Sequence, residues 1–321
     1  MKIYRSLAEI EPRAPSRAIT IGNFDGVHLA HRHLFERVVE VARKHGYVPS
    51  VLTFDPHPTR VVAPDRAPRL LSKPEQRFAW MAAAGIEQIF LLPFNRNFAE
   101  LTPEEFVEHV LVDTMHAKAV LVGANFRFGN RQRGDTALLT KMGSRFGFTT
   151  EVVSGVQVRG RMVSSTEVRR LILEGKVSLA CRLLGRPYAL EGEVVPGFGI
   201  GSRQTVPTLN LRTDAEILPA DGVYITRTQD LDTGRRWRSI TNVGFRPTFS
   251  GSSLTIETFL LEALDQTSPE RLRVEFLRRV REERKFDSPE ELKAQILQDV
   301  DRANVYFRRL SWLQQAGRQT V

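Results

Sequence analysis

The sequence predicts two domains: an α/β domain with a doubly wound, mostly parallel sheet, and then a small antiparallel β-barrel with a C-terminal helix. Three observations predict this architecture. In the first half, short apolar strands alternate with helix-like segments, as in repeated βα units. In the second half, strand-like segments follow one another between glycine and proline turns, as in a small barrel. A long helical pattern over 289–313 closes the chain. We expect domains of residues 1–185 and 186–321.

The elements of the first half are predicted by apolar runs, helical spacing and end signals. The expected strands cover residues 18–21, 48–54, 89–92, 119–122 and 149–153. The expected helices cover residues 29–45, 74–84, the segment that starts at Thr102, and 137–146. Thr102, Pro103 and Glu105 form a capping-box pattern at the start of the third helix. Ligands of such sheets bind at the carboxyl ends of the strands, so the loops that follow them hold the candidate site.

The second half begins after a short helix at 177–184, which stops at Gly185. The expected strands cover residues 190–195, 223–228, 237–243, 254–261 and 272–276. The last helix carries an apolar stripe of Leu292, Ile296, Val300, Ala303 and Phe307. Side chains at this spacing share one helix face, so we expect the stripe to pack on the barrel.

Composition limits the class of protein. The 321 residues favour two domains, and 41% apolar with 26% charged residues can build a packed core. Cys181 is the only cysteine, which excludes an internal disulfide and a cysteine-based zinc cage and fits a reducing compartment. The start of the chain lacks the apolar core of a signal peptide, and no apolar run approaches the roughly 18 residues that span a bilayer. We expect a cytoplasmic protein without a membrane partner.

The formal net charge of +9 attracts anions, which include nucleic acid, a membrane surface and small phosphorylated ligands. Composition does not choose among them, and a solvated basic surface is an equal alternative. An arginine-rich stretch at 271–284 motivates the nucleic-acid hypothesis. This stretch alternates with Leu272, Val274 and Phe276 as a strand does, and no base-stacking aromatic cluster accompanies it. Nucleic acid is therefore an unfavoured partner.

The turn G-N-F-D-G-V-H at 22–28 follows a strand and precedes a helix. Its glycines allow a ligand to approach the backbone, and the N-terminus of the helix attracts phosphate. His28 and His31 lie at that helix entry, where imidazole N–H groups can donate to phosphate oxygens. An ordinary turn with solvated histidines is the structural alternative. A zinc site lacks a third ligand nearby, and the sequence has no P-loop.

Three further segments are expected at the same sheet edge. T-F-D-P-H-P at 53–58 is a stiff loop with an acid and an imidazole, and 122–135 combines aromatic rings with arginines and an amide. R-M-V-S-S-T-E-V-R-R at 161–170 opens a helix with hydroxyls. Taken alone, S-S-T-E is simply a good helix cap. Together with Arg161 and the helix dipole, it predicts a second anion site.

These four segments, in this order, resemble nucleotidylyltransferases of the HxGH type. T-F-D-P-H-P and G-x-N-F-x-F-G resemble in particular the FMN adenylyltransferase module of prokaryotic bifunctional riboflavin kinase/FAD synthetases, over roughly residues 15–185. The resemblance implies that the FMN phosphate attacks the α-phosphorus of ATP and that pyrophosphate leaves, without a protein nucleophile. Two departures are Ala30, where the family usually has glycine, and Asn125, where many relatives carry aspartate.

The resemblance also implies residue roles in the first half. The implied catalytic residues are His28, His31 and Arg161. The implied ATP contacts are Gly22, Phe24, Asn125, Ser164, Ser165, Thr166 and Arg169. The implied flavin contacts are Asp55, His57, Pro58 and Phe128.

In the second half, Gly197, Gly199 and Gly201 precede P-T-L-N at 207–210. A dinucleotide-binding turn needs a helix directly after its glycines, and none is predicted here. A glycine loop that folds over phosphates fits better. Thr208 and Asn210 share one face of an extended segment, and their oxygens suit Mg²⁺ bridged to nucleotide phosphates. An ordinary β-turn is the alternative.

This half resembles the riboflavin kinase module of the same family in the glycine loop, P-T-L-N, P-A-D-G-V-Y, T-N-V-G-F-R-P-T-F, I-E-T and R-E-E-R-K-F. The resemblance implies that Glu257 is the base that activates the ribityl 5′-hydroxyl, although Glu257 taken alone is an exposed strand residue. The other implied roles are ATP contacts from Gly197 and Gly201, metal contacts from Thr208 and Asn210, and flavin contacts from Arg281 and Glu283. Two departures are G-S-R-Q-T-V-P-T at 201–208 and the absence of a Tyr-Gly pair after the Glu257 strand.

The resemblance therefore implies an enzyme of FAD biosynthesis: ATP phosphorylates riboflavin to FMN in the second domain, and FMN is adenylylated to FAD in the first. Riboflavin, FMN and ATP are its expected partners, with Mg²⁺ as the expected cofactor of ATP. The alternatives are an FMN adenylyltransferase with an impaired kinase half, adenylyl transfer to another acceptor, and a basic nucleic-acid-binding protein. The oligomeric state stays open.

Overall fold

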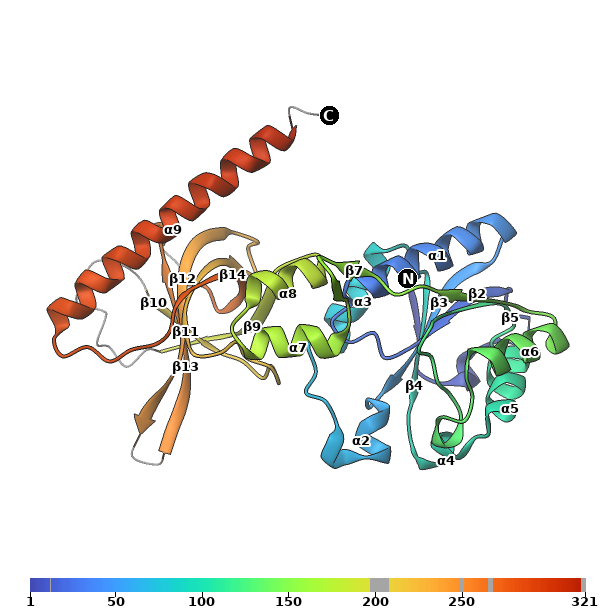
Figure 1. Ribbon diagram of the computed structural model, residues 1–321. Helices are drawn as coiled ribbons and strands as arrows, with labels where there is room; N and C mark the ends of the chain where they lie inside the picture. Colours follow the sequence, from blue (N-terminus) through green and yellow to red (C-terminus); the bar gives the residue numbers. More distant parts are fainter. Residues whose placement is uncertain (12, 197–207, 249–250, 265–267, 319–321) are drawn as a thin grey trace. The chain divides into compact units, whose positions relative to one another are not determined.

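The computed structural model describes residues 1–11, 13–196, 208–248, 251–264 and 268–318 (Figure 1). By internal contacts, the chain forms two compact units, Met1–Ser165 and Thr166–Val321. The expected boundary between residues 185 and 186 stays a prediction. Gly197, Gly201 and the altered segment at 202–206 lie outside the described residues.

The first unit is built on a parallel sheet of six strands in the order β1-β4-β3-β2-β5-β6. Its strands are β1 (Lys2–Tyr4), β2 (Arg17–Ile21), β3 (Val48–Asp55), β4 (Gln88–Pro93), β5 (Ala117–Gly123) and β6 (Thr149–Val153). Its helices are η1 (Leu7–Glu9), α1 (Leu29–His45), α2 (Pro58–Val62), η2 (Pro64–Arg66), α3 (Pro74–Ala83), α4 (Arg96–Glu100), α5 (Pro103–Glu105), the π-helix η3 (Phe106–Thr114), η4 (Asn130–Gln132) and α6 (Thr136–Phe146). A short hairpin of β7 (Gln157–Val158) and β8 (Arg161–Met162) follows.

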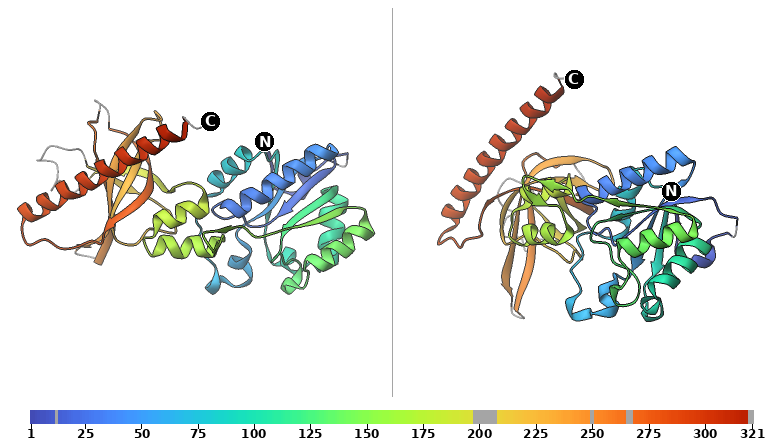
Figure 2. Two further views of the ribbon diagram at one scale, coloured as in Figure 1. Left: turned by 45° about the horizontal axis from the view of Figure 1, so that its top comes forward. Right: turned by 45° about the vertical axis from the view of Figure 1, so that its right-hand side comes forward.

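Both faces of this sheet are covered, which is why its central strand β2 is buried throughout. One core cluster joins β-strand side chains to α1 and α3, and the other joins them to η3 and α6. Figure 2 shows helices on both sides of the sheet. The buried residues of α1 are Leu34, Phe35, Val38 and Ala42, at the spacing of one helix face. The predicted doubly wound parallel domain is confirmed.

Helix α7 (Ser165–Leu173) starts at the last residue of the first unit and continues into the second, where α8 (Val177–Leu184) packs against β14 and β9. Six antiparallel strands then close a barrel in the order β10-β13-β12-β11-β14-β9. They are β9 (Tyr188–Val195), β10 (Thr208–Arg212), β11 (Gly222–Asp230), β12 (Arg236–Thr248), β13 (Gly251–Leu260) and β14 (Arg271–Arg281). The long helix α9 (Pro289–Arg318) follows. The predicted barrel with a C-terminal helix is therefore confirmed.

The barrel interior contains a chain of buried hydroxyl groups. Thr228 bonds to Ser239 at 2.8 Å, Ser239 to Thr226 at 2.8 Å, and Thr226 to Thr241 at 2.8 Å. Thr241 then bonds to Thr258 at 3.0 Å. Each hydroxyl has a hydrogen-bond partner inside the barrel. Burial of these polar groups therefore does not carry the cost of an unsatisfied donor or acceptor. Because side chains alternate along a strand, the neighbours of Thr241 and Thr258 point outward.

Helix α9 packs on the barrel with only part of its expected stripe. Val300, Ala303 and Phe307 join a cluster with barrel side chains, whereas Leu292 and Ile296 are 41% and 37% exposed. The prediction that all five stripe residues pack was therefore wrong. The polar Asp299 is buried instead, because its carboxylate accepts from Arg281 Nε of β14 at 2.8 Å. Among the described residues, no helix combines the length and apolar character needed to cross a membrane.

This ion pair predicts a stability effect. The Asp299 side chain is 3% exposed and that of Arg281 17%, so Asp299→Asn removes a charged hydrogen bond at a desolvated position. We expect the free energy of unfolding of the second unit to fall by about 2 kcal/mol, measured by urea denaturation. The exposed neighbour Asp301 is the matched control. If Asp301→Asn costs as much as Asp299→Asn, the ion pair does not anchor α9.

Candidate active sites

The turn at residues 22–28, which is predicted to bind phosphate and is called the phosphate turn below, lies at the carboxyl end of β2. It has unusual backbone geometry. Phe24, Gly26 and Val27 have φ angles of 50°, 75° and 35°, a region that side chains disfavour. At Gly26 the positive φ favours glycine, and a Cβ there would also lie 2.8 Å from Leu71 Cδ1. Phe24 is buried and its ring packs against those of Phe35 and His31, with centroids 5.0 and 5.2 Å away. The buried ring stabilises the strained turn.

The structure brings His28 and His31 together at the start of α1. His28 is the N-cap of this helix, and its Nδ1 accepts the His31 N–H at 3.3 Å. The two rings stack with centroids 3.6 Å apart and planes at 19°. Since Nδ1 of His28 is an acceptor, a neutral ring carries its proton on Nε2. The pair therefore presents imidazole groups at the positive end of the helix dipole.

Asp25 anchors the turn from inside the protein. Its buried carboxylate accepts the Leu71 N–H at 2.9 and 3.0 Å and the Ser72 hydroxyl at 3.2 Å. The Ser72 hydroxyl oxygen in turn accepts the Gly26 N–H at 3.0 Å. Ser165 donates its hydroxyl to the Asp25 carbonyl oxygen at 2.9 Å. The expected convergence of the turn with the S-S-T segment is therefore present at Ser165.

The other predicted ATP-site residues of the first half lie on several different elements. Gly22 donates its N–H to Leu52 at 3.1 Å and so continues the end of β2. Asn125 is exposed just after β5, Arg161 is exposed on β8, and Ser164 is half-buried. Thr166 and Arg169 lie on α7 in the second unit, so their place relative to the turn stays a prediction.

The T-F-D-P-H-P segment at residues 53–58, which is predicted to bind flavin and is called the flavin loop below, lies at the end of β3. Asp55 is exposed at the end of this strand, and Pro58 is the first residue of α2. His57 caps α2, since its Nδ1 accepts the Thr59 N–H at 3.3 Å. Its Nε2 lies 3.0 Å from the side-chain nitrogen of Asn23, a residue of the phosphate turn. The flavin loop and the phosphate turn are therefore in direct contact, through a residue that the sequence analysis did not select.

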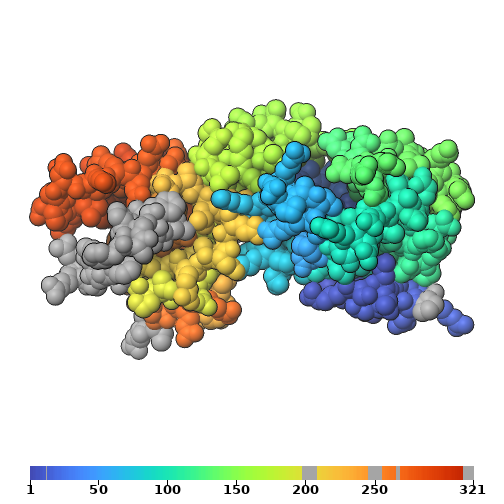
Figure 3. Space-filling model, turned by 90° about the horizontal axis from the view of Figure 1, so that it is seen from below, coloured from blue at the N-terminus to red at the C-terminus, as the bar shows by residue number. Residues whose placement is uncertain are grey.

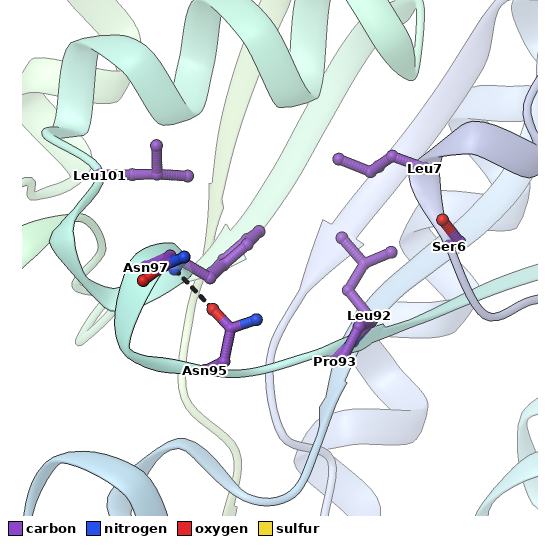
Figure 4. Close-up of a pocket in the computed structure, with 8 residues that line it drawn as sticks. Ser6, Leu7, Leu92, Pro93, Asn95, Asn97 and Leu101 are labelled. Atoms are coloured by element: carbon purple, nitrogen blue, oxygen red, sulfur yellow. Dashed lines mark hydrogen bonds between the residues drawn. The ribbon is translucent and has the colours of Figure 1, made fainter.

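Six phenylalanine rings connect the flavin loop to Phe128. Successive centroid distances of 5.5 to 6.1 Å link the rings in the order Phe94, Phe54, Phe98, Phe106, Phe128 and Phe126. Phe98 also lines a pocket of about 370 Å³ (Figure 4), within the size range of small-molecule sites. The other lining residues are Ser6, Leu7, Leu92, Pro93, Asn95, Asn97 and Leu101.

The pocket joins segments that are distant in sequence. In Figure 3 the N-terminal segment, in dark blue, lies on the surface of the first unit beside the teal residues that follow β4. Apolar side chains of Leu7, Leu92 and Leu101 line the interior, and the Asn95 side chain caps α4 by accepting the Phe98 N–H at 2.8 Å. The sequence analysis did not identify this pocket, because no single segment contains it.

Two residues predicted for the kinase site, Asn210 and Glu257, lie in a row with Asn242 across three barrel strands. Asn210 of β10 pairs with Glu257 of β13, which pairs with Asn242 of β12. All three are half-buried and alternate with the inward hydroxyls, so they share the outer barrel face. Thr208 lies two residues before Asn210, on the same face. The expected grouping of Thr208, Asn210 and Glu257 is therefore present.

Two further predicted residues lie beside this row. Glu283 is exposed and accepts the Asn242 side-chain N–H at 3.2 Å. A Cβ on Gly244 would clash with the Glu283 carboxylate, so glycine lets this acid reach β12. Arg281 is directed to Asp299 of α9, and its flavin role stays a prediction. Asn242 was missed, although it stands in the quoted segment T-N-V-G-F.

Comparisons with known proteins match both halves of the chain. A family model described as FAD synthetase matches residues 10–167, and one described as riboflavin kinase matches residues 184–307. A bifunctional riboflavin kinase/FMN adenylyltransferase of Escherichia coli (strain K12) is 34% identical, over 96% of this chain and 98% of the relative. The protein of the same name from Pseudomonas fluorescens is 35% identical, over 94% and 96%.

A similar solved structure has a different description. It is a crystal structure described as a macrolide-efflux protein from Streptococcus pneumoniae, with a TM-score of 0.84 and 29% identity. The match covers 94% of this chain and 98% of that one, so the likeness in fold extends over both units. The two family models and the two curated relatives place the chain in the family of bifunctional riboflavin kinase/FMN adenylyltransferases.

Proposed function

We propose that this chain makes FAD from riboflavin in two ATP-dependent steps. In the second unit, the γ-phosphoryl group of ATP passes to the ribityl 5′-hydroxyl of riboflavin, which yields FMN and ADP. In the first unit, an FMN phosphate oxygen attacks the α-phosphorus of ATP, which yields FAD and pyrophosphate. The observation that carries the proposal is the presence, in one chain, of both family matches in this order.

The first unit contributes charge and position to adenylyl transfer. His28 and His31 stack at the start of α1, where imidazole N–H groups and the helix dipole stabilise the charge on the ATP phosphates. Ser165 is held at the turn by Asp25, and Arg161, Ser164, Thr166 and Arg169 bind the phosphates from the other side. Asn125 and Gly22 contact the adenosine part, and Phe24 supports the turn. No side chain forms a covalent bond with substrate, because phosphoryl-type transfer depends mainly on positioning and electrostatics.

The flavin ring requires a large apolar surface near the phosphate turn. The chain of phenylalanine rings and the pocket beside Phe98 supply this surface, and aromatic rings favour offset stacking with a flat ligand. Asp55, His57 and Pro58 bind the flavin from the loop after β3. The contact between His57 and Asn23 supports this assignment, because it joins the loop to the turn that we propose as the binding site of the ATP phosphates.

In the second unit, Glu257 accepts the proton of the attacking ribityl hydroxyl. Thr208 and Asn210 present oxygen atoms beside Glu257, and this set of hard donors fits Mg²⁺, which retains water ligands and binds phosphate oxygens. Mg²⁺ supplies charge neutralisation on the ATP phosphates when it is bound. Glu283 and Arg281 contribute to the flavin side, and Gly197 and Gly201 cover the phosphates. We place the reaction in the cytoplasm.

Nucleic-acid binding gains no support from the arginine-rich stretch. Arg271 forms an ion pair with Asp232, Arg273 with Glu191 and Arg281 with Asp299. Carboxylates within the same unit therefore neutralise much of the charge that suggested such a partner.

Incubation with riboflavin, ATP and MgCl₂, followed by separation of the flavins, tests the proposal. We expect FMN to appear first and FAD afterwards, and EDTA to stop both steps. If FMN yields FAD but riboflavin yields nothing, the kinase half is impaired. If neither FMN nor FAD appears, the proposed function is wrong.

Phe98→Ala tests the flavin surface. It removes a half-buried ring that lines the pocket and contacts three other phenylalanine rings of the series. We expect the KM for FMN in adenylylation to rise about tenfold, which corresponds to about 1.4 kcal/mol of lost stacking. Phe146→Ala is the control, since Phe146 packs on the same core cluster outside the ring chain. An unchanged KM in Phe98→Ala would place the flavin elsewhere.

A further inference from the structure

Arg77 is a buried charge that the mechanism above does not use. It is 4% exposed on α3, where the other buried side chains are the apolar Phe78 and Met81. Burial lowers the pKa of Arg77, and the nearby carboxylates of Asp25 and Asp55 oppose this effect. A guanidinium buried on an apolar helix face is costly unless its contacts compensate for the lost hydration.

The guanidinium reaches the phosphate turn. Arg77 Nη1 donates to the backbone carbonyl oxygen of Asn23 at 2.9 Å, across 54 positions of sequence. Asn23 lies between Gly22 and Phe24 in that turn. Its side chain lies 3.0 Å from His57 Nε2 in the loop after β3. Arg77 and Asn23 therefore link α3, the phosphate turn and the flavin loop in one series of contacts.

A second set of contacts joins the same two segments. The Asp25 carboxylate accepts the Leu71 N–H and the Ser72 hydroxyl, immediately before α3. Asp25 thus attaches the turn to the residues just before α3, and Arg77 attaches it to the middle of that helix. The contact through Asn23 extends further, to His57 of the flavin loop.

We propose that Arg77 is a positioning residue for adenylyl transfer, which fixes the spacing between the ATP turn and the flavin loop through Asn23. This inference rests on the proposed function of the first unit. The FMN phosphate must approach the α-phosphorus of ATP in line, and a displacement of about 1 Å can cost about 100-fold in rate. Loss of the contact therefore lowers kcat more than it raises either KM.

Arg17 provides a matched control within the same unit. It is also buried, at 0% exposure, and its Nη1 donates to the backbone carbonyl oxygen of Met115 at 2.8 Å. Burial lowers the pKa of Arg17 as well. Arg17 is the first residue of β2 and thus lies at the amino end of the strand, whereas the turn follows its carboxyl end. Substitution at either arginine disturbs a buried guanidinium, but only Arg77 contacts the turn.

The test compares Arg77→Gln, Arg77→Lys and Arg17→Gln in the full chain. We expect Arg77→Gln to lower the kcat of FMN adenylylation about 100-fold, with the KM for ATP and for FMN within threefold of wild type. Arg77→Lys, which keeps a cationic donor, restores kcat to within tenfold. Arg17→Gln lowers Tm but leaves kcat within threefold. Circular dichroism and the Tm of each variant report whether the first unit is folded, and the riboflavin kinase rate of the second unit measures the concentration of active chain.

Two results overturn the inference: an Arg77→Gln kcat within threefold of wild type, or a kcat loss equal to that of Arg17→Gln. If both Arg77 variants fail to fold, Asn23→Ala decides, because it keeps the carbonyl group and removes the side chain that faces His57. A selective fall in its adenylylation kcat supports the inference, and an unchanged kcat overturns it. Failure of the proposed function is distinct, since the wild-type chain would then form no FAD from FMN.

Discussion

The His28→Asn variant is expected to lose about 100- to 1,000-fold in the kcat of FMN adenylylation while its riboflavin kinase rate stays within twofold of wild type. Asparagine is a good N-cap, and its side-chain oxygen can replace Nδ1 as acceptor of the His31 N–H. The helix start is therefore preserved. The substitution removes the imidazole and its stacking on His31, and with them the stabilisation of charge on the reacting phosphates. Steady-state rates with FMN and with riboflavin measure the two steps separately.

The exposed His109 is the control for His28. It lies on η3 and forms an exposed contact with Asp113, so His109→Gln leaves both activities unchanged. The interpretation of the turn as a phosphate cradle is contradicted if His28→Asn adenylylates FMN at the wild-type rate. A Zn²⁺ requirement of the wild-type adenylylation, lost in His28→Asn, would instead favour the metal alternative.

Most of the fold follows from local patterns. The strands at 89–92 and 119–122 are continuous apolar runs of the kind that a sheet covered on both faces requires, and each became a parallel strand. β1 was not predicted because a strand of three residues is too short to show a hydrophobic periodicity. The face of α9 was misjudged for a different reason. Asp299 is buried only because Arg281, on another element, supplies a partner, and hydrophobic periodicity takes no account of such pairs.

In the candidate sites too, some contacts follow from local sequence spacing and others depend on the packing of distant segments. His28 and His31 are one helical turn apart, so their proximity follows from spacing alone. Thr208 and Asn210 share a strand face for the same local reason. Arg77 contacts Asn23 across 54 positions, and Asn242 meets Glu257 through strand pairing. Such contacts depend on how distant segments pack. The only local sign of Arg77 is a charged residue on the otherwise apolar face of α3.

The Glu257→Gln variant is expected to lose about 100- to 10,000-fold in the kcat of riboflavin phosphorylation, because an amide cannot accept the proton of the ribityl hydroxyl. Glutamine keeps the size of the side chain, and the strand pairs with Asn210 and Asn242 involve the backbone. The barrel should therefore stay folded. Given riboflavin and ATP, this variant accumulates neither FMN nor FAD. Given FMN and ATP, it forms FAD at the wild-type rate.

Glu262→Gln separates the role of Glu257 from a general effect of removing an acid near this strand. Glu262 follows β13 and pairs with Arg238 at 2.7 Å on the surface, so its loss leaves phosphorylation within twofold of wild type. Kinase activity in Glu257→Gln would mean that another group takes the proton. Glu283 is then the carboxylate to test, because it contacts Asn242 beside Glu257, and loss of activity in Glu283→Gln alone would transfer the role of base to that residue.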